Sequence, residues 1–175
     1  MNNISYIFTF LVLLGCISEQ QSKINILQVK LLNLTQSSLE MNPQKVAHAY
    51  QGFKDNLILV RNCVDTLENE FAQRMNNYKG LKKACPQFSR TYELTKKNIE
   101  TQSKQIQNLK LDINNKLIPK DSAYYFLELE EKNLQKIADD VINLLDLYEF
   151  INSVNDSLYE PIKKYAENIC SNKEV

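Results

Sequence analysis

The sequence predicts an all-α protein, an elongated antiparallel helical bundle or coiled coil built on a heptad seam. Three Gly and four Pro in 175 residues are too few chain breakers for an all-β fold, which needs a turn every ~8 to 12 residues. From Val46 onward, apolar residues recur at alternating steps of four and three, the spacing of one face of a helix. No segment shows the period-two alternation typical of a half-buried strand.

Composition narrows the classes of function. The 21 Lys and Arg balance 21 Asp and Glu, so nothing attracts the chain to nucleic acid, and we expect no such partner. A hydrophobic content of 43% supports one folded domain over residues 19–175. One His is too few for a His-based metal site. No nucleophile motif, HExxH or phosphate-binding loop is present, so we expect neither an enzyme nor a cofactor.

Residues 1–18 are predicted to be a signal peptide. Ile4 to Leu14 is an apolar run whose length suits a signal peptide and is short for a membrane span. Cys16 and Ser18 supply the small residues that precede a cleavage site, so we place the cut before Glu19. We therefore expect a secreted chain with no stable membrane span after the signal is removed.

A bacterial lipobox at residues 13–16 is the alternative to a cleaved signal. Cys16 would then carry lipid and anchor the protein at a bacterial surface. Bacterial signals usually carry Lys or Arg before the apolar run, and this one has none. Secretion is therefore the favoured prediction.

If the chain is secreted, two sequons and three cysteines become candidates for modification. Asn33 and Asn155 become candidate glycosylation sites in a eukaryote. Cys63, Cys85 and Cys170 remain in an oxidising compartment after cleavage. Because three is odd, at least one thiol is unpaired or pairs with another chain.

The heptad seam consists of two series of positions. Every seventh residue from Tyr50 to Ile169 is apolar except Lys120 and Asn155. The companion series from Val46 to Tyr165 is apolar with five exceptions, which are Arg74, Thr95, Gln102, Lys116 and Glu130. We expect the seam to form the core of the protein rather than a ligand pocket.

Chain breakers divide this seam into helices expected near residues 20–41, 44–84, 87–118, 122–152 and 157–171. Asn42 and Pro43 are typical of an N-cap and a first helical residue. Gly80 and Pro86 indicate a kink or turn, because Pro86 removes a backbone N–H. Pro119 ends the third of these helices. The polar stretch 152–156 indicates a break, after which Ser157 and Glu160 fit a capping box.

Two architectures fit this pattern. If the chain folds back at Pro86, Pro119 and Asn155, the helices form an antiparallel bundle. If Pro86 only kinks the chain, residues 44–118 form one rod of about 110 Å. We favour the bundle, because a single rod leaves its apolar seam uncovered.

The bundle also predicts a disulfide. Cys63 and Cys170 then lie at axial levels that differ by about one or two helical turns, which small offsets between helix ends can close. Cys85 lies far from both along the axis. It is therefore predicted to be a free thiol or to pair with another chain.

Polar candidates for a site are few. His48 lies beside the seam on the second expected helix, where a surface residue or a hydrogen-bonded core residue is favoured over a catalytic base. The acidic clusters are Glu128, Glu130 and Glu131, and Asp139, Asp140 and Asp146. Carboxylates of this kind can bind calcium weakly. No loop of EF-hand spacing is present, and a solvated helix face is the favoured interpretation of both clusters.

Three stretches carry a resemblance to a known family. Residues 78–85, 98–117 and 133–148 combine Asn-, Gln- and Lys-rich heptads with a sparse cysteine inside a helix, downstream of a signal peptide. Over about residues 46–165 the chain resembles the secretory-granule core proteins of ciliates, the trichocyst matrix and granule lattice proteins. The resemblance implies coiled-coil chains that are sorted into granules, bind calcium weakly and assemble into a lattice. It assigns no functional residue.

Two hypotheses for the function follow. The first is a secreted structural or assembly protein, a component of a secretory granule or extracellular matrix, whose helical surfaces pair with copies of itself or with related helical chains. The alternative is a secreted or lipid-anchored binding module that engages a protein partner or a small apolar ligand. Association of the purified chain with itself distinguishes the two.

Overall fold

A computed structural model describes residues 19–66 and 68–173 of the chain. All regular secondary structure in these two ranges is helical, and neither contains a strand. The predicted signal peptide with Cys16 lies outside the described residues, and so does Leu67 of the heptad seam.

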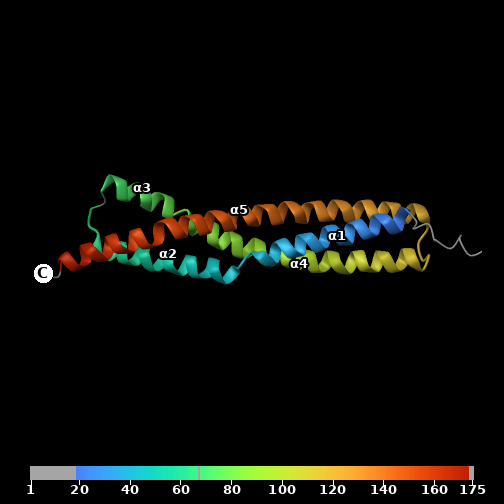
Figure 1. Ribbon diagram of the computed structural model, residues 1–175, viewed down its shortest axis with the longest axis horizontal. Helices are drawn as coiled ribbons and strands as arrows, with labels where there is room; N and C mark the ends of the chain where they lie inside the picture. Colours follow the sequence, from blue (N-terminus) through green and yellow to red (C-terminus); the bar gives the residue numbers. More distant parts are fainter. Residues whose placement is uncertain (1–18, 67, 174–175) are drawn as a thin grey trace, which may run out of the picture.

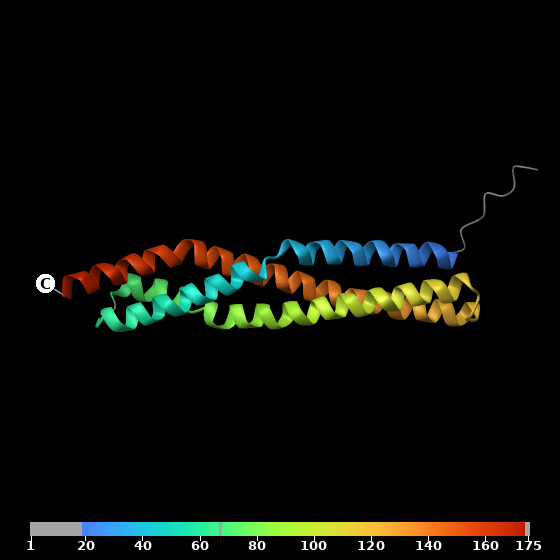
Figure 2. The ribbon, with the colours of Figure 1, turned by 90° about the horizontal axis from the view of Figure 1, so that it is seen from below.

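Five helices form a long, thin rod (Figure 1). They are α1 (Glu19–Glu40), α2 (Pro43–Cys63), α3 (Asn69–Tyr78), α4 (Leu81–Asn114) and α5 (Lys120–Lys173). Helices α1 and α2 follow one another along the rod, α3 and α4 return, and α5 runs forward along its whole length (Figure 1 and Figure 2). At 1.5 Å per residue, α5 is about 80 Å long. The predicted all-α, elongated antiparallel bundle is confirmed.

The start of α2 is as the sequence predicts. The Asn42 side-chain oxygen accepts hydrogen bonds from the backbone N–H groups of Gln44 and Lys45, at 3.0 and 3.1 Å. Pro43 is the first helical residue, where its missing N–H leaves no partner unsatisfied. The cap lets α1 and α2 meet nearly end to end.

The single helix expected over residues 44–84 is wrong. α2 ends at Cys63, Val64 is extended, and α3, which begins at Asn69, runs back along the rod. Neither Gly nor Pro marks this reversal. Asp65 and Thr66 are weak helix formers. Val64, however, continues the apolar seam, and because the seam is unbroken here the sequence pattern did not predict the end of the helix.

The chain turn predicted at Pro86 is wrong, and so is the alternative of one rod over residues 44–118. Pro86 is the sixth residue of α4 and is exposed. Its missing N–H leaves the Lys82 carbonyl without a helical partner, on a side of α4 where water can replace it. The break between α3 and α4 lies at Lys79 and Gly80, so the kink predicted at Gly80 is present.

The chain reversal predicted at Pro119 is confirmed. At the end of α4, Leu117 N–H donates to the Asp112 carbonyl at 2.9 Å, and Lys116 N–H donates to the Ile113 carbonyl at 3.2 Å. This is a Schellman motif, whose left-handed position is usually Gly. Here Lys116 occupies it, with φ of 56°.

The break predicted at residues 152–156 is wrong, because α5 continues to Lys173. The Ser157 hydroxyl donates to the Ser153 carbonyl at 2.7 Å, inside the helix. Ile151 and Ile162 are fully buried on either side of the polar stretch. The seam therefore continues through it, and the exposed ring of Pro161 lies away from the core.

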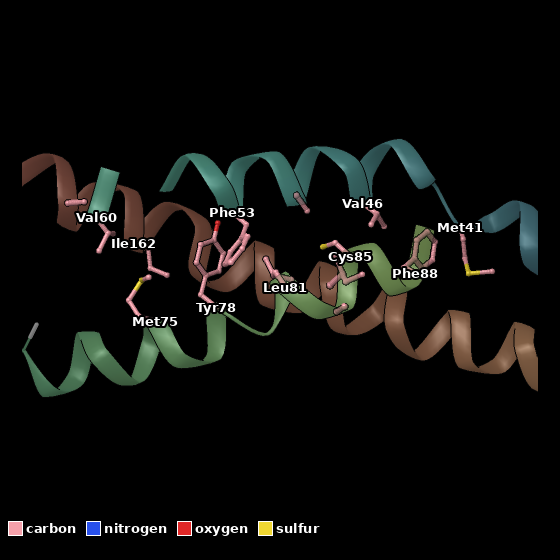
Figure 3. Packing of buried hydrophobic residues seen from close by; sticks show 14 of the residues in the cluster. Met41, Val46, Phe53, Val60, Met75, Tyr78, Leu81, Cys85, Phe88 and Ile162 are labelled. Atoms are coloured by element: carbon pink, nitrogen blue, oxygen red, sulfur yellow. The ribbon is translucent and has the colours of Figure 1, made fainter. Parts of the chain in front are cut away.

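The core consists of two apolar clusters. The first, at the end of the rod that holds α2 and α3, includes Phe53, Tyr78, Leu81, Phe88 and Ile162 (Figure 3). The second unites α1 with α4 and the first half of α5, and its buried members are Ile24, Leu27, Leu31, Ile99, Ile106, Leu109, Leu127, Leu134, Ile137 and Val141. Leu145 packs against both clusters. Together they confirm the seam as the core.

The five polar residues of the companion series are either buried or exposed, depending on their place in the fold. Thr95, Gln102 and Glu130 are buried, whereas Arg74 and Lys116 are exposed. Gln102 donates a hydrogen bond from its side-chain amide to a Glu130 carboxylate oxygen at 2.5 Å. The heptad phase therefore predicts burial of these three positions even where the residue is polar.

Thr95→Val is expected to stabilise the protein by about 1 kcal/mol, because a buried hydroxyl without a hydrogen bond costs free energy that an isosteric methyl group avoids. Among the residues that the structure describes, Thr95 carries the one fully buried side-chain oxygen or nitrogen atom with no hydrogen-bond partner. Urea unfolding with the disulfide intact measures the change. The control, Thr95→Ser, keeps the hydroxyl and loses the methyl group, so it should be less stable than wild type. A destabilised Thr95→Val protein would mean that the hydroxyl is satisfied in solution.

Candidate functional site

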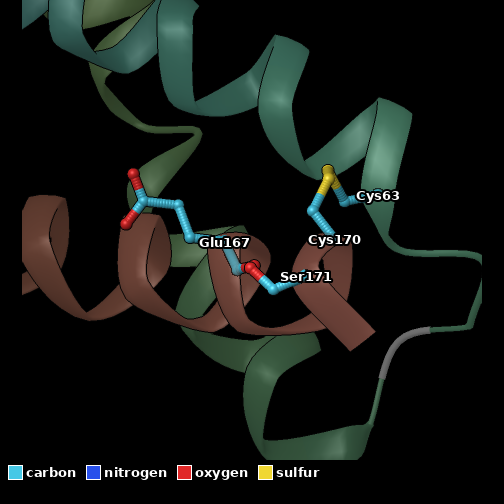
Figure 4. The surroundings of a disulfide bond; sticks show 4 residues. All are labelled: Cys63, Glu167, Cys170 and Ser171. Atoms are coloured by element: carbon cyan, nitrogen blue, oxygen red, sulfur yellow. A yellow bond between two sulfur atoms is a disulfide. The ribbon is translucent and has the colours of Figure 1, made fainter. Parts of the chain in front are cut away.

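A disulfide closes one end of the rod. It joins Cys63, the last residue of α2, to Cys170 near the end of α5, with 4.9 Å between the Cα atoms (Figure 4). The expected pair is present, but its geometric cause differs from the expected one. α5 runs in the direction of α2, so both helices arrive at the same end of the rod without any reversal at Pro86 or Asn155.

Cys85 is the free cysteine of the described chain, and it is buried in α4. It lies in the first core cluster, on the same helix as Leu81 and Phe88 (Figure 3). Burial raises the pKa of its thiol to about 11. In this fold the sulfur is out of reach of a second chain, so the intermolecular alternative would require local opening of α4.

A buried polar contact ties three helices together beside the disulfide end. Asn56 is 3% exposed, and its amide donates to the Tyr78 hydroxyl at 3.2 Å and to the Tyr159 carbonyl at 3.0 Å. The Phe53 ring meets the Tyr78 ring edge to face, with centroids 5.2 Å apart. The sequence signal was available, because Asn56 lies three residues after Phe53 and four before Val60, but we read Leu57 as the core position.

A groove of about 410 Å³ lies between α2 and α5 and contains the single histidine. His48, Lys45, Asp55 and Tyr159 are among its lining residues. Gly52 makes room for the Tyr159 ring, since a Cβ there would lie 2.8 Å from a ring carbon. Within the described residues, His48 makes no hydrogen bond or ion pair, so no acid–base pair is assembled around it.

A second groove, of about 460 Å³, separates α1 from α4. Leu31 and Leu32 line one wall, and Leu111 lines the other. Lys110 spans the groove by donating to the Gln28 side-chain oxygen at 2.7 Å. Its mixed apolar and amide lining resembles a surface between packed helices more than a pocket for a small ligand.

The acidic residues proposed for calcium do not converge. Glu130 is buried against Gln102, and Glu131 pairs with Lys30 at 2.7 Å. The hydrogen bond from Lys30 lowers the pKa of the Glu131 carboxyl. Glu128, Asp139 and Asp146 are exposed, and Asp140 lines another groove of α4 and α5. Over residues 19–66 and 68–173, no three His, Cys, Asp or Glu side chains form a group that would hold a metal ion.

The two sequons have different surroundings. Asn33 is exposed on α1, and Thr35 of its sequon donates a hydrogen bond to the Leu31 carbonyl at 2.8 Å. Asn155 is half-buried and lines the groove that contains His48. A glycan on Asn33 would extend into solvent, whereas one on Asn155 would have to fit against α2.

Two further findings complete the description. In the described part of the chain, no helix is both long enough and apolar enough to span a bilayer. Comparison of the chain with protein-family models, curated proteins and solved structures found no match.

Removing the disulfide is expected to lower the free energy of unfolding by about 5 kcal/mol, the loop-closure estimate for a crosslink of this span. The bonded residues are 107 apart in sequence. Urea unfolding of the double variant Cys63→Ala/Cys170→Ala measures the loss. Wild-type protein in excess reductant should unfold at the same urea concentration as this variant. Equal stability with and without the bond would contradict a strong constraint on the unfolded chain.

Alkaline pH is expected to destabilise the fold through two buried groups. Burial raises the pKa of Cys85 to about 11, and burial raises the pKa of Tyr78 to about 12, partly offset by the hydrogen bond from Asn56. Both groups are neutral when protonated, and their ordinary pKa values are 9.0 and 10.0. The folded state therefore holds these protons more tightly than the unfolded state does. Stability is full below pH 9 and falls through pH 9 to 11 for Cys85 and pH 10 to 12 for Tyr78.

Unfolding free energy measured against pH tests this assignment. Cys85→Ala should flatten the part of the decline that begins near pH 9, and Tyr78→Phe the part that begins near pH 10. The slope with pH is compared, because both substitutions also change packing. An unchanged slope in both variants would assign the decline to other groups.

Proposed function

We propose that this chain is a secreted structural protein that assembles with copies of itself or with related helical chains. The proposal is based on one observation. The thin rod buries its apolar seam but exposes large apolar side chains along its outer faces. These are Ile26, Val29, Leu32, Leu39, Ile58, Leu94, Leu111, Leu117, Tyr125, Phe126, Leu129, Ile142 and Phe150.

Their distribution supports association with other helices. Single exposed apolar residues are normal on any protein, whereas contiguous ones mark interaction surfaces. On α1, Ile26 lines a groove beside α5 and Leu32 lines a groove beside α4. On α5 three of them, Tyr125, Phe126 and Leu129, lie within five residues. A rod offers such faces along its whole length, which suits lateral packing into a granule or an extracellular matrix.

Secretion is supported by the disulfide and by the start of the fold. Disulfides persist in oxidising compartments and are rare in the cytosol. At the predicted mature N-terminus, Glu19 accepts a hydrogen bond from the Tyr124 hydroxyl at 2.8 Å and pairs with Lys23 at 3.4 Å. A chain cleaved before Glu19 therefore keeps the contacts of α1. Within this proposal the role is non-enzymatic, any calcium binding is weak, and the glycan on Asn33 is optional.

Sedimentation velocity of residues 19–175 tests the proposal. We expect the weight-average sedimentation coefficient to rise between ~1 μM and ~1 mM, the range in which small interfaces associate. The frictional ratio at the dilute end should be that of a rod. A single monomeric species across the whole range would contradict self-assembly and favour the alternative of a binding module.

A further inference from the structure

The chain reversal between α2 and α3 lacks the local signals that fix the reversal between α4 and α5. After α4, Lys116 takes the left-handed conformation of a Schellman motif, and Pro119 precedes α5. Between α2 and α3, by contrast, residues 53–79 contain neither Gly nor Pro. Lys116 is the one residue of the described chain with a positive φ. Asp65 and Thr66 weaken a helix, but they do not prevent one.

The two ends of this reversal are compatible with a helix. Val64 is extended, with φ of −107°. Glu68 already has the φ of a helical residue, −64°, and it provides no side-chain cap for α3. The heptad seam passes from Val60 through Val64 to Phe71 at helical spacing. Rotation of a few backbone angles would therefore make residues 43–78 one continuous helix with an apolar face along its length.

Packing, rather than local sequence, holds α1 and α2 against the rest of the rod. Both helices contact α4 and α5, and Leu27 of α1 and Phe53 of α2 are buried members of the two core clusters. The Asn56 amide donates to the Tyr159 carbonyl of α5 at 3.0 Å. A second copy of the chain contains the same α3, α4 and α5. It therefore offers the same partners for each of these contacts.

We propose that two copies of this chain exchange α1 and α2. In the exchanged dimer, residues 43–78 of each copy form one continuous helix, and α1 and α2 of each copy pack on α4 and α5 of the other. The interface is then the core of the rod rather than a surface patch. Because the exchange is reciprocal, it closes at two copies. The inference concerns the inner faces of α1 and α2, so it is independent of the exposed faces on which the proposed self-assembly rests.

The disulfide determines which form persists. Within one chain, the bond between Cys63 and Cys170 ties the end of α2 to α5 and prevents exchange. In the exchanged dimer, Cys63 of each copy lies beside Cys170 of the other. Cys63 is 1% exposed, so two folded chains that merely collide do not form this bond. Exchange therefore takes place before oxidation, at high chain concentration, and oxidation makes it permanent.

The bond between copies forms by thiol–disulfide exchange with a small-molecule disulfide such as oxidised glutathione. The Cys63 thiolate attacks one sulfur of the reagent and releases the first reduced thiol. The Cys170 thiolate of the other copy then attacks the Cys63 sulfur of this mixed disulfide and releases the second. Two cysteine thiols are oxidised, and the reagent disulfide takes up their two electrons and two protons as two thiols.

Isotope mixing of the wild-type chain, residues 19–175, tests the exchange. Unlabelled and heavy-nitrogen-labelled protein are mixed in equal amounts, unfolded under reductant, refolded at ~0.5 mM and then treated with oxidised glutathione. Trypsin separates Cys63, Cys85 and Cys170 into different peptides, so mass spectrometry identifies each bond. In covalent dimers, about half of the Cys63–Cys170 peptide pairs should carry one label of each kind, the statistical fraction for random partners. Refolding at ~1 μM should give about tenfold fewer such pairs or less.

A matched pair of variants tests the continuous helix. Asn69→Pro places proline at the first residue of α3, where proline is favoured and where the extended Glu68 before it is compatible. In the continuous helix the same proline lies in the interior, where it removes a backbone hydrogen bond and clashes with the preceding turn. We therefore expect Asn69→Pro to lower the mixed-label pairs by about tenfold or more. Asn69→Ala, at the same exposed position, permits both conformations and should leave them unchanged.

The results distinguish this inference from the proposed function. Mixed-label pairs that are no more frequent at ~0.5 mM than at ~1 μM would overturn the exchange. Mixed-label pairs that persist in Asn69→Pro would overturn it too, because the exchanged form requires a helix through this position. Sedimentation of the oxidised monomer, in which the disulfide prevents exchange, reports only on association through the outer faces. The exchange and the proposed self-assembly can therefore fail separately.

Discussion

The whole structure depends on covering one face of α5. A helix of 54 residues is stable in water only if its apolar stripe is buried along its length. No other helix of the described chain is as long, so two helices placed in series, α1 and α2, cover one side, and α3 with α4 cover the other. Each of these four helices packs against α5. The breaks between them are therefore tolerated, because α5 bridges them.

This arrangement explains which parts of the fold could be predicted from the sequence. The heptad phase identified the apolar core, and Thr95, Gln102 and Glu130 occupy core positions of the same phase. The solvated helix face favoured for Glu130 is wrong, because its side chain is buried against Gln102. The chain reversals were harder. Pro86 was interpreted as a chain turn, although an exposed proline inside a helix only leaves one carbonyl to water, and the polar stretch 152–156 was interpreted as a break, although α5 continues through it. Residues 64–68 carry no breaker, and tertiary packing, which no local pattern records, reverses the chain there.

The candidate site, too, could be predicted from the sequence only in part. The pair of Cys63 and Cys170 was predicted correctly, but from axial levels that assumed chain reversals at Pro86 and Asn155, and α4 and α5 continue through both positions. The burial of Asn56 follows from its spacing to Phe53 and Val60, but its partners do not, because one of them is a backbone carbonyl on α5, which leaves no trace in a sequence pattern. The groove around His48 was missed for a related reason, since it depends on the close approach of Tyr159 to Gly52.

The buried hydrogen bond between Gln102 and Glu130 affects which alignment α4 and α5 adopt. Near-uniform heptads allow α4 to slide along α5 by seven residues and still match apolar side chains. After such a slip, Gln102 would lie opposite Ala123 or Ile137, and Glu130 would lie opposite Leu109 or Thr95. The Glu130 carboxylate would then keep the donor Asn133 on its own helix, at 3.3 Å, but lose the closer donor Gln102, at a cost of about 2 kcal/mol. This one hydrogen bond therefore favours a single alignment of α4 against α5, whose other heptads are nearly equivalent.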